Sequence, residues 1–172
     1  MDYNKLFKGL ILDVESIQGL GASIKHGAIG LVAIAFILVI LTGSEKFSFY
    51  AWLQNFLVVF IGLLIISVLV YLFAKLLKTK ISLEKFILNV NCMFAASLFL
   101  VSMPLLLIVI FVLNQKTLGT VLFSLVPYYN FVVYGIAAES VSELKGVKAV
   151  LVALFSMSLV FIFYFILAFI TI

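Results

Sequence analysis

Two acidic residues, Glu139 and Glu143, stand one helical turn apart in the segment GIAAESVSELKG. Paired carboxylates are side chains that general acid–base catalysis commonly uses, so this pair is the first candidate for chemistry. Lys145 and Lys148 follow closely, and a solvated helix end carries the same mixture of charges. We therefore interpret the pair as surface charges and expect no catalysis by it.

Other kinds of chemistry lack the residues that they need. His26 is the only histidine and Cys92 the only cysteine, which is too few for a metal site of the histidine and thiolate type. The sequence has no glycine-rich phosphate-binding loop, and no serine has an evident base beside it. We predict that the protein is not an enzyme and that it holds no metal and no cofactor.

The segment VPYYNF places Pro127, Tyr128, Tyr129 and Asn130 within a long apolar run. Proline has no N–H and frees the carbonyl one turn earlier, at Phe123, so we expect a kink here. The segment could line a ligand cavity at the depth of a bilayer. A kink whose freed carbonyl is satisfied by a neighbouring helix explains the same residues, and both interpretations stay open.

The composition of the whole chain is typical of a membrane protein. Its 172 residues are 66% hydrophobic and 10% charged, whereas soluble domains are roughly 25% charged. The net charge of +4 comes from lysines in short polar segments beside apolar runs, where anionic lipid headgroups are the natural partner. We expect an integral membrane protein that does not bind nucleic acid.

Five apolar runs approach or exceed the ~20 residues that a helix needs to cross a bilayer. They are Ile24–Gly43, Phe49–Ala74, Phe86–Leu113, Leu118–Ala138 and Ala149–Ile172. Ahead of them, Tyr3–Gln18 collects apolar side chains on one helical face, which predicts a helix on the membrane surface or a cap over the bundle. The prediction is one all-α domain over residues 1–172, a polytopic bundle of five transmembrane helices with a short N-terminal amphipathic helix.

The lysines set the orientation of this bundle. With the amino terminus inside, only Lys46 and Lys116 of the 11 lysines fall in outer segments, and the others fall in inner segments. Because positive residues are enriched in cytoplasmic loops, we predict a multi-pass protein with a cytoplasmic N-terminus and the C-terminus outside. The inner surface then holds the candidate contacts to lipids or partners: Lys75, Lys78, Lys80, Lys85, Glu139, Glu143, Lys145 and Lys148.

Two kinds of occupant fit that inner surface. Each lysine beside an anionic leaflet gains ~1 kcal/mol of attraction to lipid headgroups. A partner, either another protein or a second copy of this chain, is the alternative, and it suits Glu139 and Glu143, which an anionic membrane repels. Both occupants stay open.

The polar residues within the apolar runs are neutral, and we expect most of them to hydrogen-bond between helices, at around 0.6 kcal/mol each. A substrate pathway is the alternative for the same residues. We expect Asn89 and Asn91 near the headgroups, because the run that contains them is longer than one crossing needs. The set is Gln54, Asn55, Asn89, Asn91, Ser97, Ser102, Ser124, Asn130, Ser156 and Ser158.

The layout of an amphipathic lead-in and five spans resembles the Yip domain family, the Ypt/Rab-interacting membrane proteins, and in particular its prokaryotic members. The family's last link often has an acidic residue, then glycine, then lysine and alanine at the start of the final span. Glu139, Gly146, Lys148 and Ala149 stand in that order here. The segment DVESIQGL, Asp13–Leu20, is similar to the prokaryotic members' segment before the first span.

This resemblance implies a non-enzymatic membrane protein that organises membranes or recruits partners. Eukaryotic members of the family bind prenylated Rab-type GTPases. The rival interpretation is a small-molecule carrier or the membrane-embedded substrate-binding subunit of an importer. A ligand cavity beside Pro127 and Asn130 would favour the carrier, and a tightly packed bundle would favour the organiser.

Overall fold

The computed structural model of the chain describes residue 32 and residues 49–97 and 116–170. The two long described segments form four helices, α4 (Phe49–Leu76), α5 (Leu83–Ser97), α7 (Lys116–Ser142) and α8 (Val147–Ile170), and contain no strand. This confirms the all-α class. The expected helix at Tyr3–Gln18, the run Ile24–Gly43 and the second half of the run Phe86–Leu113 lie outside the described residues.

Two of the four helices are long and apolar enough to cross a membrane. The suitable stretches are Trp52–Leu76 in α4 and Val147–Ile166 in α8, with 25 and 20 residues. At 1.5 Å per residue they measure roughly 38 and 30 Å, against a hydrocarbon core of about 30 Å. The third helix, α7, continues without a break across Pro127, so the expected kink does not interrupt the helix there.

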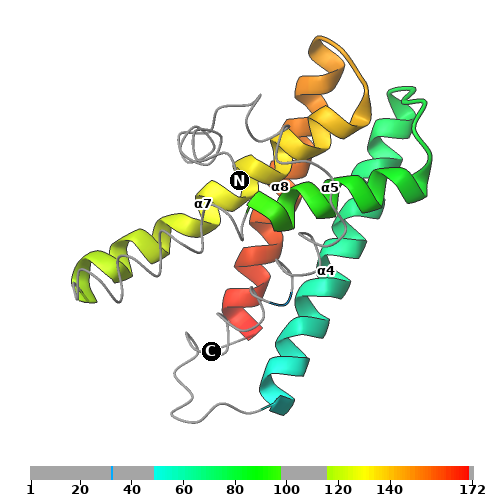
Figure 1. Cartoon of the computed structure of the whole chain (residues 1–172). Helices are drawn as coiled ribbons and strands as arrows, with labels where there is room; N and C mark the ends of the chain where they lie inside the picture. Colours follow the sequence, from blue (N-terminus) through cyan, green and yellow to red (C-terminus); the bar gives the residue numbers. More distant parts are fainter. Residues whose placement is uncertain (1–31, 33–48, 98–115, 171–172) are drawn as a thin grey trace, which may run out of the picture.

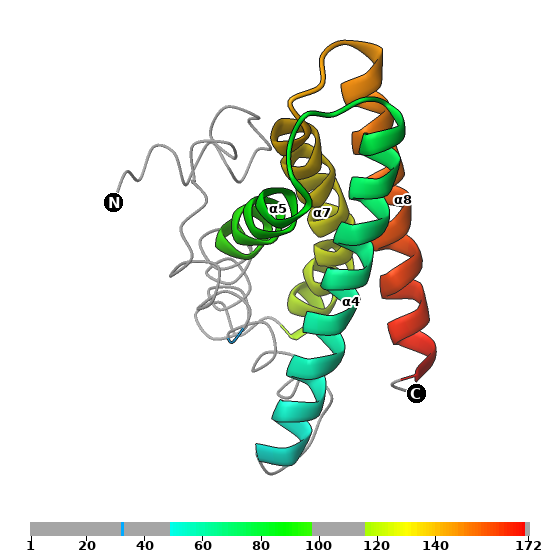
Figure 2. The same cartoon turned by 90° about the vertical axis from the view of Figure 1, so that its right-hand side faces the viewer.

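Helix α8 packs against both α4 and α7, and α5 lies across α4 and α7 (Figures 1 and 2). The most extensive contact joins α7 and α8, which are consecutive in the chain, and α5 packs against both α7 and α4. The turn between α4 and α5 and the link between α7 and α8 lie at the same end of the molecule, at the top of Figure 2.

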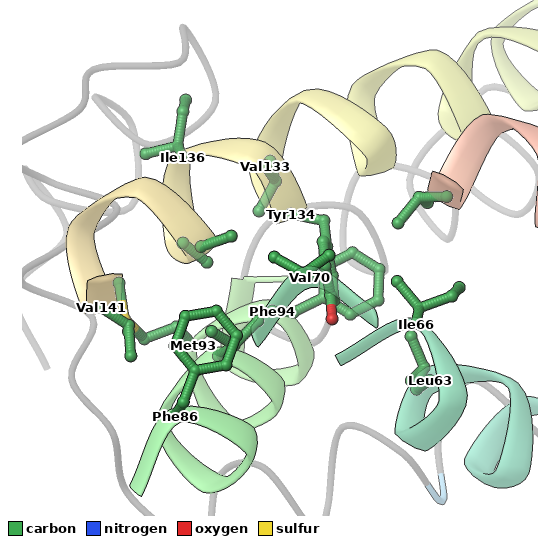
Figure 3. Packing of buried hydrophobic residues seen from close by; sticks show 14 of the residues in the cluster. Leu63, Ile66, Val70, Phe86, Met93, Phe94, Val133, Tyr134, Ile136 and Val141 are labelled. Atoms are coloured by element: carbon green, nitrogen blue, oxygen red, sulfur yellow. The ribbon is translucent and has the colours of Figure 1, made fainter. Parts of the chain in front are cut away.

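The core between α4, α5 and α7 is built around two aromatic rings. Tyr134 and Phe94 are almost fully buried and meet edge to face, with their ring centroids 5.1 Å apart. Figure 3 shows side chains of α4, including Ile66 and Val70, converging on these rings. Buried Phe86, at the start of α5, lies 5.8 Å from the ring of Tyr71 on α4.

The outward faces of the two long helices carry large apolar side chains. On α4 the exposed fraction is 51% for Ile61 and 55% for Ile65, and on α8 it is 55% for Leu154 and 58% for Phe165. Soluble monomers rarely expose apolar surface that is continuous along a whole helix. These faces have the character of a surface in contact with lipid.

Glycines allow α8 to approach its neighbours closely. A methyl group added at Gly135 of α7 would stand 2.6 Å from Met157 and 3.0 Å from the backbone oxygen of Ala153. A methyl group at Gly62 of α4 would stand 2.2 Å from the ring of Phe163. All three distances are shorter than ordinary van der Waals contact, so the helix spacing depends on these two glycines.

Candidate functional site

Hydrogen bonds join the two polar connections at one end of the molecule. The Thr79 hydroxyl, after α4, donates to the carbonyl of Ser142 at the end of α7, at 2.5 Å. The ammonium of Lys148, in the first turn of α8, donates to the carbonyl of Leu77 at 3.4 Å. We call residues 75–85 and 139–148 together the loop junction.

The backbone at the end of α4 directs Thr79 toward α7. The amide of Thr79 donates to the carbonyl of Ala74, and the amide of Lys78 donates to that of Lys75, at 3.1 and 3.0 Å. This pair of bonds is the Schellman motif, which ends a helix with one residue in the left-handed region. Lys78 fills that position with a φ of 73°, where glycine is usual. The turn leaves Thr79 with only 5% of its surface exposed.

The link between α7 and α8 is fixed in a similar way. The Ser142 hydroxyl donates to the carbonyl of Glu139 at 2.7 Å and accepts the amide of Leu144 at 3.3 Å. Glu143 has a φ of 57°, so it is the second residue in the left-handed region at a helix end. Gly146 has a φ of 60°, and its carbonyl accepts the amides of Ala149 and Val150 at 3.1 and 3.3 Å, at the start of α8.

The loop junction carries a net positive charge. Its six lysines are exposed and outnumber its three glutamates, of which Glu84 and Glu143 are exposed and Glu139 is half-buried. The structure therefore brings the sequence-predicted charged residues to one end of the molecule. The lysines are Lys75, Lys78, Lys80, Lys85, Lys145 and Lys148.

The residues of the VPYYNF segment face in different directions. Tyr128 is 54% exposed, and its ring lies 5.9 Å from that of Phe131 and 6.5 Å from that of Phe161 on α8. Asn130 is buried and its amide donates to the hydroxyl of Tyr164 at 3.1 Å. Tyr128 thus lies on the outside of the α7–α8 pair, whereas Asn130 joins the two helices.

A buried polar network joins α4, α5 and α7. The Ser67 hydroxyl donates to the carbonyl of Leu63 at 2.6 Å, and it lies 2.8 Å from the hydroxyl of Tyr134. The amide nitrogen of Asn91 donates to the same Ser67 oxygen at 2.8 Å and to the carbonyl of Ile87 at 2.9 Å. Asn91 therefore bonds between helices, as expected for the polar residues of the apolar runs, and its expected position near the headgroups stays a prediction.

Counting protons assigns the donors in this network. Ser67 has one hydroxyl proton, and the carbonyl of Leu63 can only accept, so Ser67 donates there. The proton between Ser67 and Tyr134 must then belong to Tyr134. The Asn91 amide is oriented by Ile87, since a flipped amide would set two oxygens against each other. The Ser67 oxygen therefore accepts two bonds and donates one.

Sequence reasoning included Asn91 among the polar residues of the spans but missed Ser67 and Tyr134. A signal for Ser67 was present, since it lies at helical spacing from Leu63, Val70 and Ala74, all of which are buried. Nothing in the sequence signalled that Tyr134 would reach it. Asn91 Oδ1 is buried without a hydrogen-bond partner among the described residues.

The chemistry that these groups can perform is hydrogen bonding and charge attraction. Within residues 49–97 and 116–170, no three His, Cys, Asp or Glu side chains lie close enough together to hold a metal ion. Comparison of the chain with family models, with curated proteins and with solved structures finds no match.

Proposed function

We propose that this chain is a multi-pass integral membrane protein of the Yip type that organises membranes or recruits partners and does not catalyse a reaction. In this proposal its five helices cross the membrane, with the N-terminus in the cytoplasm and the C-terminus outside. The observation that carries the proposal is the loop junction, where the Thr79–Ser142 and Lys148–Leu77 hydrogen bonds join two charged connections into one surface.

The placement in a membrane is supported by the exposed apolar faces of α4 and α8. Their spanning stretches reach the loop junction, which includes Leu76 and Val147. A bilayer would cover the apolar faces and leave the loop junction in the aqueous phase. A surface held in a fixed shape at the end of a bundle is suited to recognising another molecule, because little conformational entropy is lost on binding.

The segment around Asn130 supports the organiser over the carrier. Asn130 bonds to Tyr164 of α8, and Tyr128 lies outside the α7–α8 pair, so we expect neither residue to line a cavity. One observation favours the carrier as a second candidate, namely the buried Asn91 Oδ1, which accepts no hydrogen bond from the described residues. A ligand that donates a hydrogen bond would satisfy this atom.

Photo-cross-linking in the source cells tests the proposed function. A photoreactive amino acid placed at Glu143 is expected to capture one discrete protein, and the same probe at Tyr50, at the opposite end of α4, is expected to capture none. The exchange variant K80E/E143K keeps the net charge but rearranges it between two exposed positions, and we expect it to lose the captured protein. Cross-links to lipid alone in the unaltered protein would contradict partner recruitment.

The carrier is tested by what purifies with the protein in mild detergent. The unaltered protein would then retain a small molecule that the N91L variant, with its fold intact, has lost. That result would support the carrier and contradict the organiser. The matched control is S158A, because the Ser158 hydroxyl is exposed and bonds only to Leu154 of its own helix in the described part of the chain.

A further inference from the structure

We propose that the loop junction binds the headgroups of anionic phospholipids, such as phosphatidylglycerol. This inference rests on the membrane placement in the proposed function, and it names the chemical class of ligand for the surface defined above. The lipid phosphate would lie among the exposed lysines, and the acyl chains would lie along α4 and α8.

The first argument is the close succession of charged and apolar side chains along both long helices. Leu76 and Val147 are 80% and 75% exposed, among the most exposed large apolar side chains of the described residues. Exposed Lys75 and Lys78 flank Leu76, and in α8 exposed Lys148 is followed further into the helix by exposed Val150, Leu151 and Leu154. One phospholipid molecule carries an anionic and an apolar part in this same succession, so a single ligand fits both features.

The second argument is that the apolar surface continues away from the lysines. Below Leu76, the exposed side chains of Leu72, Leu69 and Ile65 extend along α4 at helical spacing. In a bilayer, acyl chains cover this surface, so the lipids beside it have their headgroups at the level of the lysines. A lipid can therefore contact the apolar side chains and the lysines at the same time, whereas a soluble protein can contact only the lysines.

The third argument is that the lysines come from two connections far apart in the sequence and held together. Thr79 and Ser142, whose hydrogen bond joins the connections, are separated by 63 residues. Lys148 is turned toward α4 by its bond to Leu77. The lysines thus act as one cationic surface, and an anionic headgroup can interact with charges from both connections at once.

Native mass spectrometry of the full chain in a neutral detergent, titrated with dioleoyl phosphatidylglycerol or dioleoyl phosphatidylcholine, tests this proposal. We expect phosphatidylglycerol to bind at least tenfold more tightly than phosphatidylcholine. Removing three exposed lysines in the variant K75Q/K80Q/K145Q is expected to abolish most of this preference, since each lysine contributes about fivefold. Lys78 and Lys148 are left unchanged, because they take part in the structure of the junction.

Two control variants separate a site at the loop junction from general charge attraction and from protein docking. K116Q removes a lysine at the start of α7, distant from the junction along that helix, and is expected to leave the preference unchanged. K80E/E143K keeps the net charge, and we expect it to bind phosphatidylglycerol within threefold of the unaltered protein. Thermal unfolding in detergent without added lipid checks that each variant is folded.

Equal affinity for the two lipids would overturn the proposal, as would a preference that K116Q reduces as much as the triple variant does. Loss of the preference in K80E/E143K would also overturn it, because the surface would then act by its pattern of charges, as protein docking requires. The proposed recruitment is judged separately by the cross-link at Glu143. Lipid selectivity without a captured protein would leave the lipid site standing and remove partner recruitment.

Discussion

At the scale of single residues, Ser67 hydrogen-bonds to two other helices in the interior. Its oxygen accepts hydrogen bonds from Tyr134 and Asn91, so it connects α4 with α7 and α5. A serine in the middle of an apolar helix is a weak signal in a sequence, because the hydroxyl can bond back to its own helix, as Ser156 and Ser158 do. Its partners are set by packing across three helices, which residue types alone do not specify.

Replacing Ser67 is expected to cost more than replacing Tyr134. S67A leaves the Tyr134 hydroxyl and one Asn91 proton buried without an acceptor, and we expect a loss of roughly 2 kcal/mol in the free energy of unfolding. Y134F leaves Ser67 with two of its three bonds, so we expect a loss of about 0.6 kcal/mol, the mean for such bonds in membranes. Reversible unfolding in mixed micelles measures both.

The double variant S67A/Y134F sharpens this comparison. It has no tyrosine hydroxyl left without an acceptor. Its loss in the free energy of unfolding should therefore be smaller than the sum of the losses in the two single variants. S158A is the matched control and should change the free energy of unfolding by less than 0.5 kcal/mol, in line with ordinary surface substitutions. Equal losses for S67A and S158A would contradict the network.

The positive φ of Lys78 gives a second prediction at this scale. A side chain in the left-handed region costs roughly 1 kcal/mol or more, and glycine avoids this cost. We therefore expect K78G to be about 1 kcal/mol more stable than K78Q, which keeps the strain but also removes the charge. Thermal unfolding of the two variants tests this, and K80G, where φ is not positive, should show no gain over K80Q.

At the scale of elements, α7 and α8 depend on close backbone approach. G135A would push a methyl group against Met157 and the carbonyl of Ala153, and a backbone oxygen cannot rotate away. We expect G135A to lose about 1–3 kcal/mol in the free energy of unfolding. G62A meets only the ring of Phe163, a side chain that can turn, so its loss should be smaller.

A rescue variant makes the G135A result specific. M157A removes the side chain that the new methyl group would meet. G135A should therefore cost less stability when it is introduced into M157A than when it is introduced into the unaltered protein. An absence of any coupling between the two positions, measured as a double-mutant cycle, would show that the helices do not approach as closely as the structure places them.

Sequence reasoning was most accurate for the elements with long apolar runs. The boundaries of α4, α7 and α8 lie within four residues of the predicted runs, because an apolar run of 20 residues or more has few alternatives to a helix. The direction of α5 was not predictable. Its placement across the bundle follows from the side chains that Phe94 and Asn91 find on α4 and α7, and such contacts are not encoded in the local pattern.

At the scale of the whole molecule, the lysine distribution and the loop junction make the same prediction about sidedness. Because hydrogen bonds join the two connections, K80C and K145C must lie on the same side of a membrane. Both are expected to be labelled from the cytoplasm by a membrane-impermeant thiol reagent. Cys92 is buried and should not react in the folded protein.

A reporter fused after Ile172 completes the topology prediction. With five crossings and a cytoplasmic N-terminus, this reporter should report an external location, whereas a reporter after Lys80 should report an internal one. Activity of both reporters on the same side would rule out the five-span arrangement and leave the loop junction with a different membrane environment.

The hydrogen bond between Thr79 and Ser142 also has a consequence for the order in which the protein is made. A ribosome adds roughly 5–20 residues per second, so the 63 residues between the two partners take about 3–13 s to synthesise. During this interval α4 is already complete and α5 is made, but Thr79 has no Ser142 carbonyl to bond with. The connection between α4 and α5 must therefore wait for α7, and the loop junction can form only after the end of α7 has left the ribosome.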